Sequence, residues 1–269
     1  MIAAAAIAAL LVAAAPVPFA ERPAVEAWAS EDWASDALAA VARLPGARLG
    51  LTLRSNMIRP EAAAVLKQSD AAAVRLQPSG LASAHVDTLR KLPRTRLVVP
   101  LSGPLDPALA AQLAKLGPQP FRLELTAGLD AKIAKSLAGL KNAEVVLDVR
   151  GRMPDQEELG LLLGLSRVSR VVRLRADDPP ALVAALKTVR PARLVVEAVE
   201  GARVPEAMIA ALVESGLPAR VAVDLRASPD DLRRLAALPQ ISLELALSGD
   251  SDTALPKARA LLEPLVSGP

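Results

Sequence analysis

Cysteine is absent from the 269-residue chain, and histidine occurs only once. Without cysteine the protein can form no disulfide, no thiolate nucleophile and no cysteine-ligated zinc site. A single histidine also argues against most metal sites and catalytic triads that depend on imidazole. Aromatic residues are nearly as rare, with two tryptophans, two phenylalanines and no tyrosine. The sequence predicts neither a metal nor a cofactor.

An excess of charge of one sign is also lacking. The chain carries 32 basic and 29 acidic residues, for a formal net charge of +3. A mixed surface of this kind argues against nucleic acid as a partner. Hydrophobic residues make up 52% of the chain, which is ample for a large core.

The N-terminal stretch differs in composition from the rest. Residues 1–20, MIAAAAIAALLVAAAPVPFA, are apolar and then broken by two prolines. An apolar run of this length is typical of a signal peptide, with cleavage before Glu21. The sequence therefore predicts a periplasmic or secreted protein, with residues 21–269 as a single β/α repeat domain. The alternatives are a mis-assigned start and an uncleaved segment, which would be the only expected contact with a membrane.

The remaining chain repeats itself every 49 residues. Segments headed by Ala72, Phe121, Arg170 and Ala219 each read as strand, helix, strand, helix. The same pattern extends back to Ala24. The period predicts five double repeats, or about ten strand–helix units.

Prolines mark the expected helix starts. A proline in the first helical turn sacrifices no hydrogen bond and presets φ. Asp106 and Ser228 directly precede two of these prolines and are expected N-caps. The prolines are Pro60, Pro107, Pro154, Pro180, Pro205 and Pro229.

Strands that alternate with helices are expected to be parallel, with right-handed crossovers. Two architectures satisfy this pattern: an open right-handed β/α solenoid, shaped like a horseshoe, and a closed (β/α)8 barrel of TIM type. One strand face is apolar and must meet the helices, whereas the other face carries many charges. Filling a narrow barrel with charges is costly, so this face and the ten units favour the solenoid. The barrel would need the two N-terminal units to lie outside the ring.

Two segments carry a resemblance to a known family. LAGLKNAEVVLDVRG and LAALPQISLELALSG place leucines before a strand. An LxLxxN pattern occurs at Leu51, Leu53 and Asn56. In these features the chain resembles leucine-rich-repeat proteins. The resemblance implies a horseshoe-shaped binding scaffold, usually for protein, whose concave strand face is the contact surface.

The polar strand face is the candidate site. Several of its arginines stand near the carboxyl ends of strands, where guanidinium groups and helix N-termini would attract anions. A salt-bridge ladder without function is the simpler explanation of the same pattern. The candidate residues are Trp28, Arg54, Glu124, Asp148, Arg150, Arg175, Glu197, Asp224 and Arg226.

Three isolated residues also give expectations. Trp28 could stack on a ligand or cap one end of a solenoid. His85 is expected on the surface, and Pro100 is expected to interrupt the pairing of its strand.

The favoured function is a non-catalytic scaffold that binds a protein or an envelope polymer through the polar strand face. The alternative is a barrel enzyme, intact or degenerate, that acts on an anionic or carbohydrate substrate. Paired carboxylates on the polar face, such as Glu124 and Glu244, are of the type that glycosidases use, but no nucleophile or phosphate-binding motif accompanies them.

Overall fold

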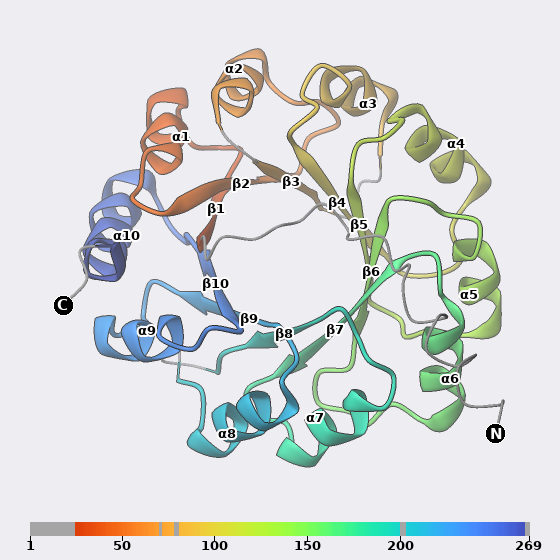
Figure 1. The fold of residues 1–269 in the computed structure, drawn as a ribbon. Helices are drawn as coiled ribbons and strands as arrows, with labels where there is room; N and C mark the ends of the chain where they lie inside the picture. The colour runs from red at the N-terminus through yellow and green to blue at the C-terminus, as the bar shows by residue number, and fades with distance from the viewer. Residues whose placement is uncertain (1–24, 70–71, 78–80, 200–202, 267–269) are drawn as a thin grey trace, which may run out of the picture.

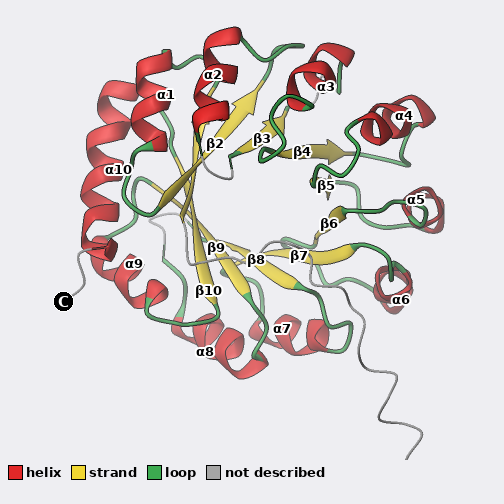
Figure 2. Ribbon diagram, turned by 45° about the horizontal axis from the view of Figure 1, so that its top comes forward, coloured by secondary structure: helices red, strands yellow, loops and turns green. Residues whose placement is uncertain are grey.

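Ten strands and ten helices alternate along the part of the chain that the structure, a computed structural model, describes: residues 25–69, 72–77, 81–199 and 203–266. The strands form an inner ring and the helices an outer ring (Figures 1 and 2). The count of ten units and their order agree with the 49-residue repeat.

The strands are β1 (Val25–Ser30), β2 (Ala47–Leu53), β3 (Ala73–Leu76), β4 (Arg96–Leu101), β5 (Phe121–Leu125), β6 (Ala143–Asp148), β7 (Ser169–Arg175), β8 (Arg193–Glu197), β9 (Ala219–Asp224) and β10 (Ile241–Ala246). The helices are α1 (Ser35–Ala42), α2 (Pro60–Gln68), α3 (Ser83–Leu89), α4 (Pro107–Lys115), α5 (Ala131–Leu137), α6 (Gln156–Gly164), α7 (Pro180–Lys187), α8 (Glu206–Ser215), α9 (Pro229–Ala236) and α10 (Ser251–Val266).

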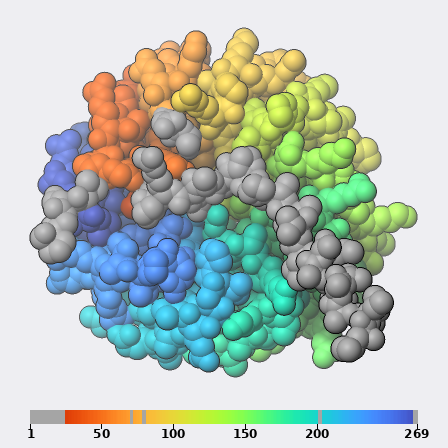
Figure 3. Space-filling model, in the orientation of Figure 1, coloured from red at the N-terminus to blue at the C-terminus, as the bar shows by residue number. Residues whose placement is uncertain are grey.

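The sheet is a closed parallel barrel in which every strand pairs with its neighbours in sequence. Closure is made by β1 and β10, where Ala27 lies opposite Leu245 and the amide of Leu247 donates to the carbonyl oxygen of Trp28 at 2.9 Å. The first and last units therefore lie side by side, as the meeting of orange-red and blue atoms in Figure 3 also shows.

This closure overturns the solenoid and the resemblance to leucine-rich-repeat proteins, because an open horseshoe has two unpaired edge strands. The barrel alternative is correct in architecture. Its expectation of eight strands with two units outside is wrong, since all ten strands belong to the ring. Barrel diameter grows with strand number, so ten strands enclose a wider interior than eight and leave room for long charged side chains.

The main hydrophobic core lies between the two rings. It is formed by the outward-facing strand residues, such as Leu97, Leu123 and Val221, and by the inner faces of the helices. These strand residues are the apolar face that the alternation predicts. The alternate residues point into the barrel, where only two small apolar clusters occur among the described residues.

Helix starts follow the proline pattern closely. Four of the expected prolines, Pro60, Pro107, Pro180 and Pro229, are the first residues of their helices, and Pro205 is an N-cap. Pro154 falls one residue outside the prediction, directly before the N-cap Asp155. The expected N-caps are also confirmed. The Asp106 carboxylate accepts from the amide of Ala108, and the Ser228 hydroxyl accepts from that of Asp231.

Pro100 behaves as expected of a residue without an amide hydrogen. Pairing of β4 with β3 ends where Arg75 lies opposite Val98, before Pro100 is reached. On the other side β4 continues alongside β5, with Pro100 opposite Glu124. The interruption therefore affects only one edge of the strand.

No helix in the described ranges is long and apolar enough to cross a membrane. The predicted signal peptide, residues 1–20, lies outside those ranges.

Candidate functional site

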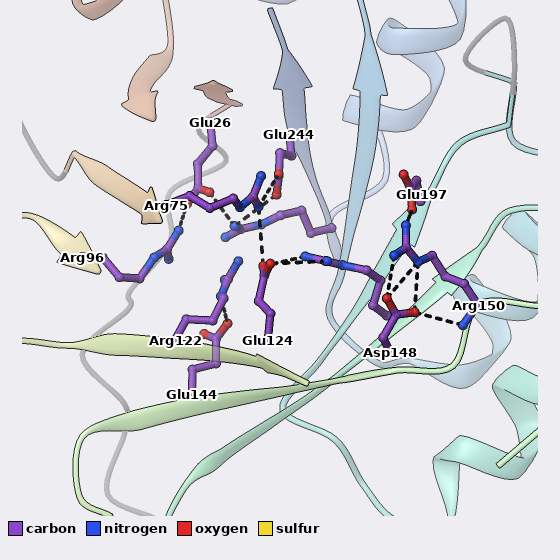
Figure 4. Close-up of polar contacts among 12 residues, drawn as sticks. Glu26, Arg75, Arg96, Arg122, Glu124, Glu144, Asp148, Arg150, Glu197 and Glu244 are labelled. Atoms are coloured by element: carbon purple, nitrogen blue, oxygen red, sulfur yellow. Dashed lines mark hydrogen bonds and ion pairs between the residues drawn. The ribbon is translucent and has the colours of Figure 1, made fainter. Parts of the chain in front are cut away.

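The interior of the barrel holds a network of ion pairs (Figure 4). Most of these pairs join strands that are not neighbours in the sheet, so they form across the ring. Arg75 on β3, for example, reaches Glu244 on β10 at 3.3 Å. Such contacts explain how a closed barrel tolerates the charges that, on sequence alone, favoured an open sheet.

One part of the network lies at the amino-terminal end of the barrel and is formed by residues near the starts of strands. Glu26 on β1 accepts from Arg96 on β4 at 2.5 Å and from Arg220 on β9 at 2.8 Å. Arg122 on β5 contacts Glu144 on the adjacent strand β6. All five side chains are buried. Each glutamate here is thus held by at least one guanidinium group.

The middle of the network surrounds Glu124. Arg173 donates to this carboxylate at 2.6 Å, and Arg75 lies 3.5 Å from the same oxygen. The guanidinium of Arg75 also lies over the indole of Trp28, 4.1 Å from the ring centroid, in a cation–π contact. Trp28 is therefore a buried residue of the barrel interior, and the expectation that it caps a solenoid is wrong.

Trp28 occupies its place because the opposite residue is glycine. Gly50 lies beside it on β2. A Cβ atom at position 50 would lie 2.4 Å from Trp28 Cδ2, far inside van der Waals contact. The close approach of the indole to this strand therefore requires glycine.

The carboxylates of this network are held ionised. Burial alone would raise the pKa of Glu124, but the attraction of Arg75, Arg173 and Arg122, together with the hydrogen bond from Arg173, outweighs burial and lowers the pKa to about 2. The same competition between burial and nearby arginines places the pKa values of Glu26 and Glu144 below the usual range. A general acid or base works best with a pKa near the operating pH, so none of these three carboxylates is suited to proton transfer at neutral pH.

Ion pairs also occupy the carboxyl-terminal rim of the barrel. Arg150 bridges Asp148, at 2.6 Å, and Glu197. Arg226 pairs with Asp224 at 2.6 Å. These ion pairs are more exposed to solvent than the interior pairs, so each contributes less to stability.

The remaining predicted rim arginines lie at the same end. Arg175 contacts Asp177 at 2.8 Å, and Arg54 donates to the side-chain oxygen of Gln77 at 3.1 Å. The structure thus gathers Arg54, Arg150, Arg175 and Arg226 at one end of the barrel, at or just after the ends of different strands. It places Trp28 and Glu124 inside the barrel.

His85 does not lie on the surface as expected. It is fully buried in α3, where its Nδ1 accepts from the amide of Ala82 and its Nε2 lies 3.0 Å from the carbonyl oxygen of Ser55. Burial lowers its pKa. Both ring nitrogens are used in joining α3 to the loop after β2, so the role of His85 is structural.

Five charged, inward-facing residues were missed from sequence: Arg48, Arg96, Glu144, Arg193 and Arg220. Each stands at the first or second position of its strand, two residues before an inward-facing position. Strand parity was the signal that could have found them, since alternate residues share a face. The expected strands RLVVPL, EVVLDV and RLVVEAV already began at Arg96, Glu144 and Arg193, so what was missed was the assignment of these first residues to the polar face.

A cleft of about 550 Å³ opens at the carboxyl ends of β1, β2 and β10. This volume is within the range of small-molecule sites, and the carboxyl-terminal end is where β/α barrels hold their ligands. Trp33 forms part of the wall, and its Nε1 donates to the carbonyl oxygen of Gly249 at 3.2 Å. The lining residues are Ser30, Asp32, Trp33, Ala34, Arg54, Leu247, Ser248, Gly249, Asp250 and Ser251.

The cleft is fixed by contacts around it. The Glu31 carboxylate accepts from the amides of Arg54 and Ser55, at 2.7 and 2.8 Å, which holds the loop after β2 against the end of β1. On the other side Asp250 accepts from the amide of Thr253 at 2.9 Å in the first turn of α10. These hydrogen bonds hold the segments on both sides of the cleft in place.

No protein-family model matches the chain, and no curated protein matches it. Among solved structures, it is similar to a tryptophan synthase from M. tuberculosis, with 16% identity, a TM-score of 0.42, and coverage of 91% of this chain and 92% of that one. A structure from Aquifex aeolicus VF5 has 13% identity, the same TM-score and the same coverage. At these values the assignment of the barrel rests on the strand pairing of this chain itself.

Proposed function

We propose that the protein is a small-molecule-binding barrel that takes a polyhydroxylated, carbohydrate-like ligand in the cleft at the carboxyl ends of β1, β2 and β10. The observation that carries the proposal is the cleft itself, with its volume of about 550 Å³ and its polar lining. This function is a form of the alternative predicted from sequence, a barrel that recognises a carbohydrate, here without catalysis.

The lining suits hydroxyl groups better than anions. Asp32 and Asp250 supply acceptors, whereas Arg54 supplies donors. A sugar hydroxyl both donates and accepts, so it can use both kinds of group. Two carboxylates against one guanidinium give the cleft a negative balance, which disfavours an anionic ligand. Serine hydroxyls and the largely buried Trp33 complete the lining.

The interior network supports binding rather than acid–base catalysis. Its arginines hold Glu26, Glu124 and Glu144 in the ionised form, so these carboxylates are poor proton donors. The network instead joins strands across the ring and stiffens the barrel that carries the cleft.

A protein or envelope polymer as partner stays a prediction. Closure of the ring places the predicted strand surface inside the barrel. A macromolecule could therefore reach only the rim or the outer faces of the helices.

Saccharide binding by the intact protein tests the proposal. We expect a panel of mono- and disaccharides, followed by saturation-transfer NMR and calorimetry, to yield at least one ligand. The variants Arg54→Met and Asp32→Asn should each weaken its binding about tenfold, as for the loss of one charged hydrogen bond.

The matched control is Arg226→Met, which removes an arginine from the same rim but outside the cleft. Its affinity should be unchanged. The proposal is wrong if no saccharide binds at millimolar concentration, or if Arg226→Met weakens binding as much as Arg54→Met does.

A further inference from the structure

Positive charge is in excess at the amino-terminal end of the barrel interior. We call the charged, inward-facing residues at the first or second position of their strands the amino-terminal layer. Five of them are arginines and two are glutamates. The layer consists of Glu26, Arg48, Arg96, Arg122, Glu144, Arg193 and Arg220.

Arg122 is the most enclosed member of this layer. Its side chain has no exposed surface, and its contact with Glu144 is made through Nε. Its two terminal nitrogens, Nη1 and Nη2, are buried and have no hydrogen-bond acceptor among the described residues. A guanidinium group carries five N–H donors, and buried donors are almost always satisfied. The unsatisfied donors of Arg122 therefore point to a missing acceptor.

The nearby glutamates are engaged with other arginines. Glu244, which lies beside Glu26 in the sheet, is 3.3 Å from Arg75 and 3.8 Å from Arg220. One oxygen of Glu26 accepts from Arg96 and the other from Arg220. Higher in the barrel, Glu124 is held by Arg75 and Arg173. None of these carboxylates can turn to the terminal nitrogens of Arg122 without breaking a buried pair.

The charge balance differs between the two neighbouring arginines. At Arg122 the nearby glutamates outweigh burial and raise the pKa above its usual range. At Arg96 burial lowers the pKa, and repulsion from Arg122 and Arg220 adds to the decrease against the attraction of Glu26 and Glu144. Figure 4 shows Arg96 and Arg122 in the same part of the interior, with Glu26 above them. A negative ion in this region would relieve the repulsion.

We propose that a small monovalent anion of halide size, chloride, binds inside the barrel at Nη1 and Nη2 of Arg122, near Arg96 and Arg220. A water molecule could accept the same hydrogen bonds but would leave the surplus charge uncompensated.

The surroundings limit the size of the ion. Val146, Val171 and Val195, on β6, β7 and β8, form an apolar cluster that begins two residues beyond Glu144. Val98 on β4, opposite Arg122, packs with Trp28 and Ala73 in a second apolar cluster. A large or multiply charged anion would be enclosed by apolar surface that offers it no hydrogen bonds. Arg48 and Arg193 are half-buried and give the amino-terminal opening of the barrel a positive charge. This charge attracts a small anion toward the opening.

Crystals of the unmodified protein grown with bromide in place of chloride give the direct test. We expect an anomalous-scattering peak in hydrogen-bonding contact with the terminal nitrogens of Arg122. Ordinary water density there, with no anomalous signal, would overturn the proposal.

Unfolding at constant ionic strength gives the second test. With gluconate, an anion too large for the site, as the replacement, the thermal midpoint should rise by about 3–5 °C for each tenfold increase in chloride above its dissociation constant. The variant Arg122→Met should lose this shift. Arg233→Met, on the exposed face of α9, should keep it. A midpoint of the unmodified protein that does not depend on chloride would also overturn the proposal.

Discussion

Replacing Glu26 with glutamine is expected to lower the free energy of unfolding by about 3–5 kcal/mol. Glu26 is buried and lies between Arg96 and Arg220, at 2.5 and 2.8 Å. Glutamine keeps the size of the side chain but removes the charge, which leaves two buried guanidinium groups without their counter-ion. Urea unfolding at pH 7, followed by circular dichroism, measures the loss.

The matched control is Asp230→Asn. Asp230 pairs with Arg233 at 2.5 Å on α9, but its side chain is 89% exposed. Solvent screens this pair, so its loss should change stability by less than about 1 kcal/mol. Equal effects of the two substitutions would show that the interior of the barrel is hydrated and open, contrary to the burial described above.

Acid is expected to destabilise the protein strongly between pH 4.5 and pH 2. The pKa of Glu124 falls from its ordinary value of 4.5 to about 2 in the folded barrel. A depressed pKa contributes stability that is present above the unfolded pKa and is lost as pH falls through the folded one. Glu124 alone should account for about 3 kcal/mol. Glu26 and Glu144 act in the same direction.

Urea midpoints measured from pH 7 to pH 2 test this dependence. The variant Glu124→Gln should be less stable at pH 7 and should lose less stability on acidification. Glu206→Gln serves as the control, because Glu206 is exposed and pairs with Arg234 on the outside of α8. If Glu124→Gln retained the full dependence on pH, the ionised state of Glu124 would not contribute to folding.

The strand–helix units could be predicted from sequence because their signals are local. Proline and N-cap residues mark helix starts, as at Pro107 and Asp106, and alternation within a strand assigns its two faces. The 49-residue period gave the number of units without any knowledge of their arrangement. These features depend only on residues within one unit or its neighbours.

Closure of the ring could not be predicted in the same way. A strand in the middle of an open arc and a strand in a barrel have the same two neighbours, so only the pairing of β1 with β10 distinguishes the two folds. That pairing depends on the summed twist and stagger of all ten strands. The charged strand face favoured the open arc because its cross-barrel partners, such as Arg75 and Glu244, are far apart in sequence.

The candidate site was predicted only in part. Parity placed Glu124 and Asp148 on the polar strand face, and position along the strand placed Arg54 near one end of the sheet. The cleft itself was missed because it joins residues from both ends of the chain, with Ser30 and Asp32 facing Ser248 and Asp250. Only closure brings these segments together.

The distance between α1 and α10 tests the closed ten-stranded ring most directly. Because the chain has no cysteine, Asp36→Cys and Asp252→Cys provide the only two sites for spin labels. Both side chains are exposed, and they lie in the first turns of α1 and α10. Helices in contact lie about 8–10 Å apart, so pulsed electron spin resonance should give a mean distance on the order of 20 Å once the label arms are included. In an open arc, nine strand spacings of about 4.8 Å would separate the first and last strands, so a distance of about 40 Å or more would contradict the closed barrel.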